Sequence, residues 1–280
     1  MRLDAKTILI TGSTDGVGRR VALHLAEAGA EVLVHGRSAE RGESLLAEMR
    51  GKGNDKGRLY IADVSSLAEV RKLAHAIARE HPRLHVLINN AGIGSAGRRG
   101  ERETSRDGYE LRFAVNYLAG FLLTRLLLPL VKASAPARIV NVASLGQQAL
   151  DFEDVMLTGG YDGGRAYSQS KLAQIMFTLD LARELKGSGV TVTCLHPATY
   201  MDTTMVRQAG VSPRSTVEEG AQAILNLAVS PDLEGRTGDF YDRKRLARAN
   251  PQAYDELARE RLRRLSLELT GLAPAPTPSA

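Results

Sequence analysis

Tyr167 and Lys171 stand four residues apart in the segment AYSQSK. On an α-helix, side chains at positions i and i+4 share a face, so the phenol and the ammonium would be neighbours. A free tyrosine has a pKa of about 10, and a nearby cation lowers it towards the range that acid–base catalysis needs. Such a pair also arises often on solvated helix faces, so the spacing alone only nominates a proton donor.

Ser144 ends the apolar run RIVNVAS. In a parallel sheet the end of a strand lies at the carboxyl edge, where ligands bind, so its hydroxyl could hold a substrate oxygen beside Tyr167. Taken alone, Ser144 could equally cap a turn, and Asn116 could be an ordinary buried amide. A hydrolase using Ser144 and His196 is disfavoured because Ser144 lacks the G-x-S-x-G elbow.

The segment TGSTDGVGR places three glycines directly after an apolar run, at the expected turn into a helix. Glycine there lets the backbone turn tightly and approach a pyrophosphate, whose charge would be met by amides at the helix N-terminus. The position between the first strand and the first helix strengthens an otherwise weak pattern. The sequence therefore predicts a dinucleotide site along Gly12, Ser13, Thr14, Asp15, Gly16, Val17 and Gly18.

Short runs rich in Val, Ile and Leu alternate with longer amphipathic stretches. The runs lack polar alternation, as strands buried on both faces require, and the intervening helices supply right-handed crossovers. The expected strands are TILIT, EVLVHG, RLYIAD, HVLINN, RIVNVAS, VTVTCLHP and GDFYD, and the expected helices cover residues 17–28, 39–50, 67–80, 106–132, 165–186, 217–229 and 251–269. We predict an α/β fold, a Rossmann-type doubly wound parallel sheet of about seven strands with helices on both faces. It forms one domain over residues 1–270, followed by a disordered tail over 271–280.

Composition disfavours several other classes of function. The 280 residues, 43% of them hydrophobic, can bury a large core, and the single cysteine, Cys194, fits a reducing cytoplasm. The net charge of +5 is scattered, and the basic stretches at 243–248 and 259–264 lack interleaved aromatic residues, so no nucleic acid is expected as a partner. The apolar stretch at 117–131 is broken by Arg125 and Pro129, so no membrane span is predicted. The histidines show no metal-ligand spacing, so no metal is expected.

Taken in order along the chain, these motifs resemble the short-chain dehydrogenases/reductases. The matches are TGxxxGxG from Thr11, Asp63 after the third strand, NNAG at residues 89–92, Asn116, Ser144 and the Tyr167/Lys171 pair. The resemblance implies an oxidoreductase that interconverts a carbonyl and an alcohol by hydride transfer. By the same resemblance Tyr167 is the acid/base, Lys171 tunes it and holds the nicotinamide ribose, Ser144 orients the carbonyl, and Asn116 maintains a water chain to Lys171.

The resemblance also implies cofactor contacts beyond the glycine loop. They are Asp63, Val64, Asn90, Ala91, Gly92, Tyr167, Lys171, Pro197, Thr199 and Thr203. Asp63 and Val64 would meet the adenine ring, although Asp63 could also cap the next helix. The family usually has Pro-Gly after the sixth strand, whereas this chain has Pro197-Ala198, so Thr199 and Thr203 both stay open as partners of the nicotinamide.

The end of the second strand decides between the two dinucleotides. An acidic side chain there would accept hydrogen bonds from the ribose and repel a 2'-phosphate, but the position is Gly36, followed by Arg37. A guanidinium grips a phosphate with two hydrogen bonds, so NADP(H) is expected in preference to NAD(H). Asp15 argues the other way, because NADP-dependent relatives often place a basic residue in the glycine loop.

The long segment between Ser144 and Tyr167 looks like the retinol-dehydrogenase and carbonyl-reductase-like branch of the family. It would overlie the active site and partly mask a helix face used in tetramers, which leaves a monomer, a dimer and a tetramer open. Residues 200–213 resemble a mobile substrate lid, whose methionines either shape an apolar pocket or pack helices. We expect a soluble, cytoplasmic enzyme with a small-molecule carbonyl or alcohol substrate, which could be lipophilic.

Two alternative functions would use the same fold. One is a non-catalytic NADP(H)-binding redox sensor or regulator, against which the intact catalytic set argues. The other is a reductase of carbon–carbon double bonds. Fold and motifs do not identify the substrate.

Overall fold

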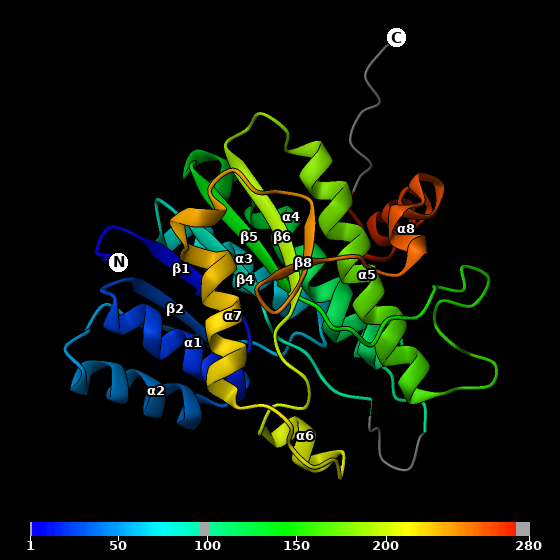
Figure 1. Ribbon diagram of the computed structural model, residues 1–280, viewed down its shortest axis with the longest axis horizontal. Helices are drawn as coiled ribbons and strands as arrows, with labels where there is room; N and C mark the ends of the chain where they lie inside the picture. The colour runs from blue at the N-terminus through cyan, green and yellow to red at the C-terminus, as the bar shows by residue number, and fades with distance from the viewer. Residues whose placement is uncertain (1, 96–100, 273–280) are drawn as a thin grey trace.

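The computed structural model describes residues 2–95 and 101–272 as one twisted sheet with helices on both faces (Figure 1). Eight strands pair in the order β3-β2-β1-β4-β5-β6-β7-β8, and every pair is parallel except β7 with β8. The chain order reverses between β1 and β4, and such a reversal opens a crevice at the carboxyl ends of the strands. The predicted doubly wound fold is confirmed.

The elements follow the predicted alternation closely. The strands are β1 (Thr7–Ile10), β2 (Glu31–Gly36), β3 (Arg58–Ile61), β4 (Val86–Asn89), β5 (Ala137–Val142), β6 (Val190–His196), β7 (Asp239–Asp242) and β8 (Arg245–Ala247). The α-helices are α1 (Gly16–Glu27), α2 (Ala39–Gly51), α3 (Leu67–Glu80), α4 (Ala119–Ala133), α5 (Gly163–Glu184), α6 (Thr204–Gln208), α7 (Val217–Val229) and α8 (Glu256–Leu269). A π-helix, η2 (Phe113–Leu118), precedes α4, and the 3-10 turns are η3 (Pro231–Leu233) and η4 (Pro251–Tyr254).

Two apolar cores lie on opposite faces of the sheet. Along β1, Ile8 and Ile10 enter the core beneath α1, α2 and α7, whereas Leu9 enters the core beneath α3, α4 and α5. Both faces of the central strands are therefore apolar, which explains why these strands read as unbroken hydrophobic runs. Figure 1 shows α1, α2 and α7 on the near side of the sheet and α8 against α5 at its right.

Three elements depart from the predictions. The helix expected from Arg106 begins later, because Gly108 adopts a φ of +84° in a turn closed by the Ser105 hydroxyl, which accepts from the amides of Asp107 and Tyr109. The helix expected over 251–269 divides at Asp255, whose carboxylate caps α8. The sheet has an eighth, antiparallel strand rather than seven parallel ones. Most of the predicted tail, from 273 to 280, lies outside the described residues.

One helical stretch, Phe113–Ala133, is long and apolar enough to cross a membrane by length and composition. In the structure 72% of its most apolar window is buried inside the protein. It packs between α3 and α5 against the sheet, as a core helix does. The stretch is therefore weak evidence for a membrane span, and the expected absence of a span stays a prediction.

The long segment between β5 and α5 is fastened to the C-terminal elements. The Leu150 amide donates to Gln252 Oε1 at 2.6 Å, and Gln252 Nε2 donates back to the Leu150 carbonyl at 3.0 Å. On the neighbouring surface of α5, Leu262 from α8 is buried with 1% of its surface exposed. The end of the described chain thus completes the core over α4 and α5.

Replacing Leu262 by Ala should lower the free energy of unfolding by about 2–5 kcal/mol, because it leaves a cavity between α5 and α8. The control is Leu257→Ala on the same helix, whose side chain is 77% exposed and should change stability by less than about 0.5 kcal/mol. Urea unfolding curves measure both. Equal effects of the two changes would contradict the described packing of α8.

Candidate active site

The loop after β1 requires its glycines. Gly12 and Gly16 have φ angles of +64° and +52°, in the left-handed region. A Cβ on Gly12 would lie 2.8 Å from the Ala91 Cα, and one on Gly18 would lie 2.3 Å from the Gly12 carbonyl oxygen. Asp15 caps α1 by accepting a hydrogen bond from the Gly16 amide at 2.7 Å. The loop is therefore a tight turn that leads into a helix N-terminus, as predicted.

Two side chains that the sequence analysis did not assign hold this loop in place. The Gly12 amide donates to His35 Nδ1 at 3.1 Å, and burial lowers the pKa of His35 to about 4, so the neutral imidazole is an acceptor at neutral pH. The Thr11 hydroxyl oxygen accepts from the amides of Asn90 and Ala91, each at 3.0 Å. His35 directly precedes Gly36 at the end of β2, and this position in the sequence could have indicated its role.

The NNAG segment locks the loops after β1 and β4 together. Asn90 Nδ2 donates to the Thr11 carbonyl at 2.8 Å and to the Gly12 carbonyl at 3.1 Å. Asn89 is buried and donates to Thr124 Oγ1 and Asn141 Oδ1, so its side chain buttresses the neighbouring strand β5. The Asn90 amide thus supports the glycine loop, and its direct contact with a cofactor stays a prediction.

At the end of β2 the structure leaves no room for an acidic side chain. A Cβ on Gly36 would lie 2.5 Å from the hydroxyl oxygen of Thr14. Arg37 follows, exposed, and nearby Arg41 Nη1 lies 3.4 Å from the Asp15 carboxylate. Asp15 therefore has a cationic partner, which offsets part of its negative charge in the glycine loop.

Asp63 lies on the same rim, at the end of β3. Burial raises its pKa, but hydrogen bonds from Ser65 and the charges of Arg37 and Arg106 outweigh this effect, and the net shift is downward. The cap of α3 is Ser66, whose hydroxyl accepts from the Glu69 amide at 3.4 Å, so the reading of Asp63 as the helix cap is wrong. Val64 is buried, with 8% of its surface exposed.

Ser144 and Tyr167 meet at the carboxyl edge of β5. A Cβ on Gly146 would lie 3.5 Å from Ser144 Oγ and 3.6 Å from Tyr167 Cε1. The side chains of Ser144 and Tyr167 therefore approach each other beside Gly146. Burial raises the pKa of Tyr167, and a hydrogen bond with Ser144 opposes part of this shift. Without a bound cofactor the phenol is thus a weaker acid than free tyrosine, contrary to the direction expected from Lys171.

Lys171 is buried one turn further along α5. Its Nζ donates to the Val142 carbonyl and to Gln174 Oε1, both at 2.9 Å, and lies 5.8 Å from the centroid of the Tyr167 ring. Burial lowers the pKa of Lys171 to about 7. The spacing i, i+4 does bring the phenol and the ammonium to one face of the helix, and Gln174 at i+3 was missed although its spacing is equally helical.

Asn116 lies inside the π-helix η2, and both polar atoms of its side chain make hydrogen bonds to neighbouring residues. Its Oδ1 accepts from the Ile93 amide at 2.7 Å, and its Nδ2 donates to the Ile93 carbonyl at 3.2 Å and to Ser170 Oγ at 2.9 Å. A Cβ on Gly92 would lie 3.2 Å from Asn116 Oδ1 and 3.5 Å from Lys171 Nζ. Asn116 and Lys171 are therefore brought together around Gly92, and the water chain between them stays a prediction.

The loop after β6 reaches both the site and the glycine loop. Thr203 caps α6, and its Cγ2 would lie 3.3 Å from a Cβ on Gly16. Thr199 Oγ1 lies 3.0 Å from His196 Nε2, while Pro197 is buried beside it. Of the two threonines, Thr203 is thus the one against the glycine loop. Met201 packs on Gly220 of α7, whereas Met205 lies against Gly94 and stays 39% exposed.

These features fit a dinucleotide. The glycine loop provides a close backbone approach at the N-terminus of α1, and the exposed Arg37 after β2 offers positive charge for a phosphate. Ser144, Tyr167 and Lys171 lie at the same sheet edge. Among the described residues, no group of His, Cys, Asp or Glu has an arrangement that could hold a metal ion.

Comparison with known proteins agrees with this class of site. Residues 6–212 match the family model described as short chain dehydrogenase, so the chain belongs to that family. Retinol dehydrogenase 13 of Mus musculus is 37% identical over 98% of this chain and 86% of its own. The protein is thus a short-chain dehydrogenase/reductase that acts on CH–OH and C=O groups.

Solved structures show the same fold. An uncharacterized protein from Mycobacterium paratuberculosis superposes with a TM-score of 0.79 at 28% identity, over 96% of this chain and 95% of its own. The RhlG/NADP active-site complex of Pseudomonas aeruginosa superposes with a TM-score of 0.71 at 28% identity, over 86% of this chain and 95% of its own. In that complex NADP lies in the active site of the Pseudomonas protein.

Replacing Gly18 by Ala should weaken NADPH binding at least about tenfold, because the new methyl group would force the glycine loop away from Asn90 and the Gly12 carbonyl. The matched control is Gly51→Ala at the end of α2, where a Cβ meets nothing within 4 Å. Fluorescence titration with NADPH measures both, without tryptophan background since the chain has no Trp. Unchanged affinity in Gly18→Ala would exclude this loop as the cofactor cradle.

Proposed function

We propose that this protein is an NADP(H)-dependent enzyme that interconverts a ketone or aldehyde and the corresponding alcohol, with Tyr167 as acid/base. The observation that carries the proposal is the convergence of Ser144, Tyr167 and Lys171 at the carboxyl edge of the sheet, beside the glycine loop. A bound nicotinamide would supply or accept the hydride. The side chains of this site have only to hold the substrate oxygen and exchange its proton.

Each side chain has a role that follows from its surroundings. The Ser144 hydroxyl can donate a hydrogen bond to the substrate oxygen and hold it beside Tyr167. Tyr167 gives its proton to that oxygen when a carbonyl is reduced and takes it back when an alcohol is oxidised. Lys171, when charged, favours the tyrosinate that remains, and Asn116 keeps the backbone around Ile93 in place.

The rim of the site favours an apolar substrate. Leu145, Tyr200 and Met205 are 47%, 45% and 39% exposed, and they lie on the segments that follow β5 and β6. Exposed large apolar side chains beside a site are a natural contact for the hydrocarbon part of a ligand. The similarity to retinol dehydrogenases supports the same proposal, a lipophilic alcohol or carbonyl compound.

The choice of NADP(H) is supported by Arg37 and by the packed Gly36. An acid at position 36 would collide with Thr14, and Arg37 would offer a bidentate contact to a 2'-phosphate. Two similar structures, one a complex with NADP and the other a complex with NADPH, point the same way.

Tyr167→Phe should lower kcat at least about 100-fold and leave the NADPH dissociation constant within about threefold, because only the proton donor is removed. NADPH oxidation with a panel of apolar aldehydes and ketones measures turnover. Tyr254→Phe, at an exposed tyrosine far along the chain, is the control. Wild-type turnover in Tyr167→Phe would refute the role of this residue.

Arg37→Ala should raise the dissociation constant of NADPH about 10- to 100-fold, the loss of a charged hydrogen-bonded contact, and leave that of NADH nearly unchanged. Arg50→Ala, at the far end of α2, should alter neither. Parallel titrations with the two cofactors give the comparison. Equal losses for NADPH and NADH would mean that Arg37 does not meet the 2'-phosphate.

A further inference from the structure

Gln174 holds the ammonium of Lys171 from within the same helix. Both side chains are buried, at 4% and 5% exposure, and their polar atoms lie 2.9 Å apart. An ammonium has only donors, so the amide oxygen of Gln174 must face it. The other acceptor is the Val142 carbonyl at the end of β5, which leaves the third donor of Nζ for the side where Gly92 lies.

The charge of Lys171 is held by neutral groups. The titratable groups that face it are Tyr167 on its own helix and His196 at the end of β6, whose pKa is lowered by burial and in part by Lys171 itself. No carboxylate contributes to the pKa of Lys171, which burial alone displaces downward. Each acceptor therefore matters, because an uncompensated buried ammonium gives up its proton readily.

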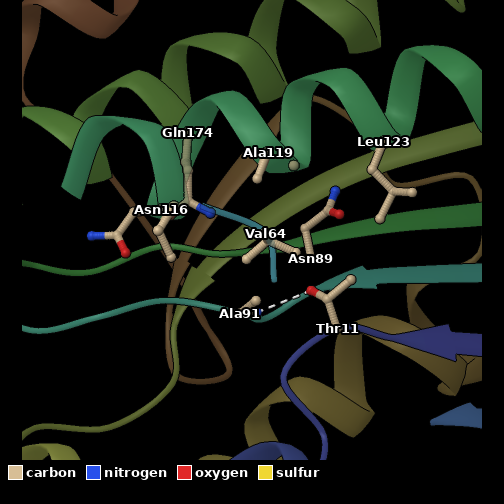
Figure 2. Close-up of a pocket in the computed structure, with 10 residues that line it drawn as sticks. Thr11, Val64, Asn89, Ala91, Asn116, Ala119, Leu123 and Gln174 are labelled. Atoms are coloured by element: carbon tan, nitrogen blue, oxygen red, sulfur yellow. Dashed lines mark hydrogen bonds between the residues drawn. The ribbon is translucent and has the colours of Figure 1, made fainter. Parts of the chain in front are cut away.

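Gln174 also lines a small cavity, shown in Figure 2, together with Thr11, Asn89 and Asn116. The cavity has about 10 Å³ of space for the centre of a water molecule, enough for one. Asn89 Oδ1 is buried with no hydrogen-bond partner among the described residues. Asn89 and Gln174 therefore line one space of about the size of a water molecule.

We propose that Gln174 is a positioning residue that keeps the proton on Lys171 and thereby sets the pH at which the Tyr167–Lys171 pair loses its first proton. The inference rests on the proposed function, in which this pair acts. The two groups are coupled, so the pH is a property of the pair rather than of either residue. The Gln174 amide oxygen stabilises the doubly protonated pair, the form that reduces a carbonyl.

Two near-isosteric changes should move this pH in opposite directions. Gln174→Met removes the acceptor. The pH at which kcat for carbonyl reduction falls on the alkaline side should therefore be lower by about half a pH unit or more. Gln174→Glu places an opposite charge beside Nζ, so the pH of this alkaline fall in kcat should be higher by about one pH unit. The controls are Gln169→Met and Gln169→Glu, because Gln169 is also buried on α5 but donates to the Ala149 carbonyl instead.

Opposite shifts at position 174, with no shift at 169, would support the inference. A merely structural role would lower activity in both variants without shifting the pH of the alkaline fall in kcat, and that result, or shifts of the same sign, would overturn it. Should Gln174→Glu fail to fold, as judged by thermal unfolding, the downward shift at position 174 against the unmoved Gln169 variants carries the test. Should Gln174→Met fail to fold, Gln174→Asn replaces it. Its shorter amide cannot reach Nζ, so it should behave as Gln174→Met does.

The pH dependence of NADPH affinity separates this inference from the proposed function. Lys171 is expected to contact the cofactor, so the affinity should titrate with the same pair. If no carbonyl is reduced by the wild type but the pH dependence of the affinity still shifts in opposite directions in the two variants, the proposed reaction fails and the role of Gln174 stands. If the wild type reduces a carbonyl and neither pH dependence shifts in the variants, the proposed reaction stands and the role of Gln174 fails.

Discussion

One buried positive charge constrains the architecture of this site. Removing an ammonium from water costs several kcal/mol, and the Lys171 ammonium recovers this only from the Val142 carbonyl, the Gln174 amide and whatever meets its third donor. Those partners come from two elements, so the end of β5 must sit in register with the third turn of α5. The cores on both faces of the sheet fix that register, and the side-chain-free Gly92 leaves the approach to Nζ open.

The loops at the carboxyl edge are tied to one another by hydrogen bonds within the protein itself. Thr11 and Asn90 join the loops after β1 and β4, and Asn89 and Asn141 continue the connection to β5 and α5 through Thr178. A site cross-linked in this way needs little reorganisation when a ligand enters. This preorganisation is what orients dipoles and donors before the reaction begins.

Much of the fold was readable from local pattern because every central strand is buried on both faces and every crossover helix is amphipathic. The glycine loop was readable because positive φ angles and close packing leave few residues but glycine. The π-helix around Asn116 was not, because its extra residue per turn depends on tertiary partners such as Ile93 and Ser170. Nor was the antiparallel β8, whose three residues carry too little pattern.

Within the site, sequence order located Ser144, Tyr167 and Lys171, but the pKa directions depended on burial that only the fold defines. The cofactor-free Tyr167 has a raised pKa because desolvation outweighs its polar contacts. The roles of His35 and Thr11 were not predicted, because these side chains act by accepting hydrogen bonds from backbone amides. The role of such a residue is not marked by any regular spacing in the sequence.

The hydroxyl of Tyr117 lies 2.6 Å from Ser266 Oγ, across 149 residues of sequence. Tyr117 directly follows Asn116 in the π-helix, so a segment near the end of the described chain braces the turn that carries this amide. During synthesis the ribosome releases the N-terminal strands first, and the sheet can begin to pair while the rest of the chain is still being made. The hydrogen bond that braces the segment around Asn116, however, can form only once α8 has emerged, so this part of the candidate site is completed after the strands that position it.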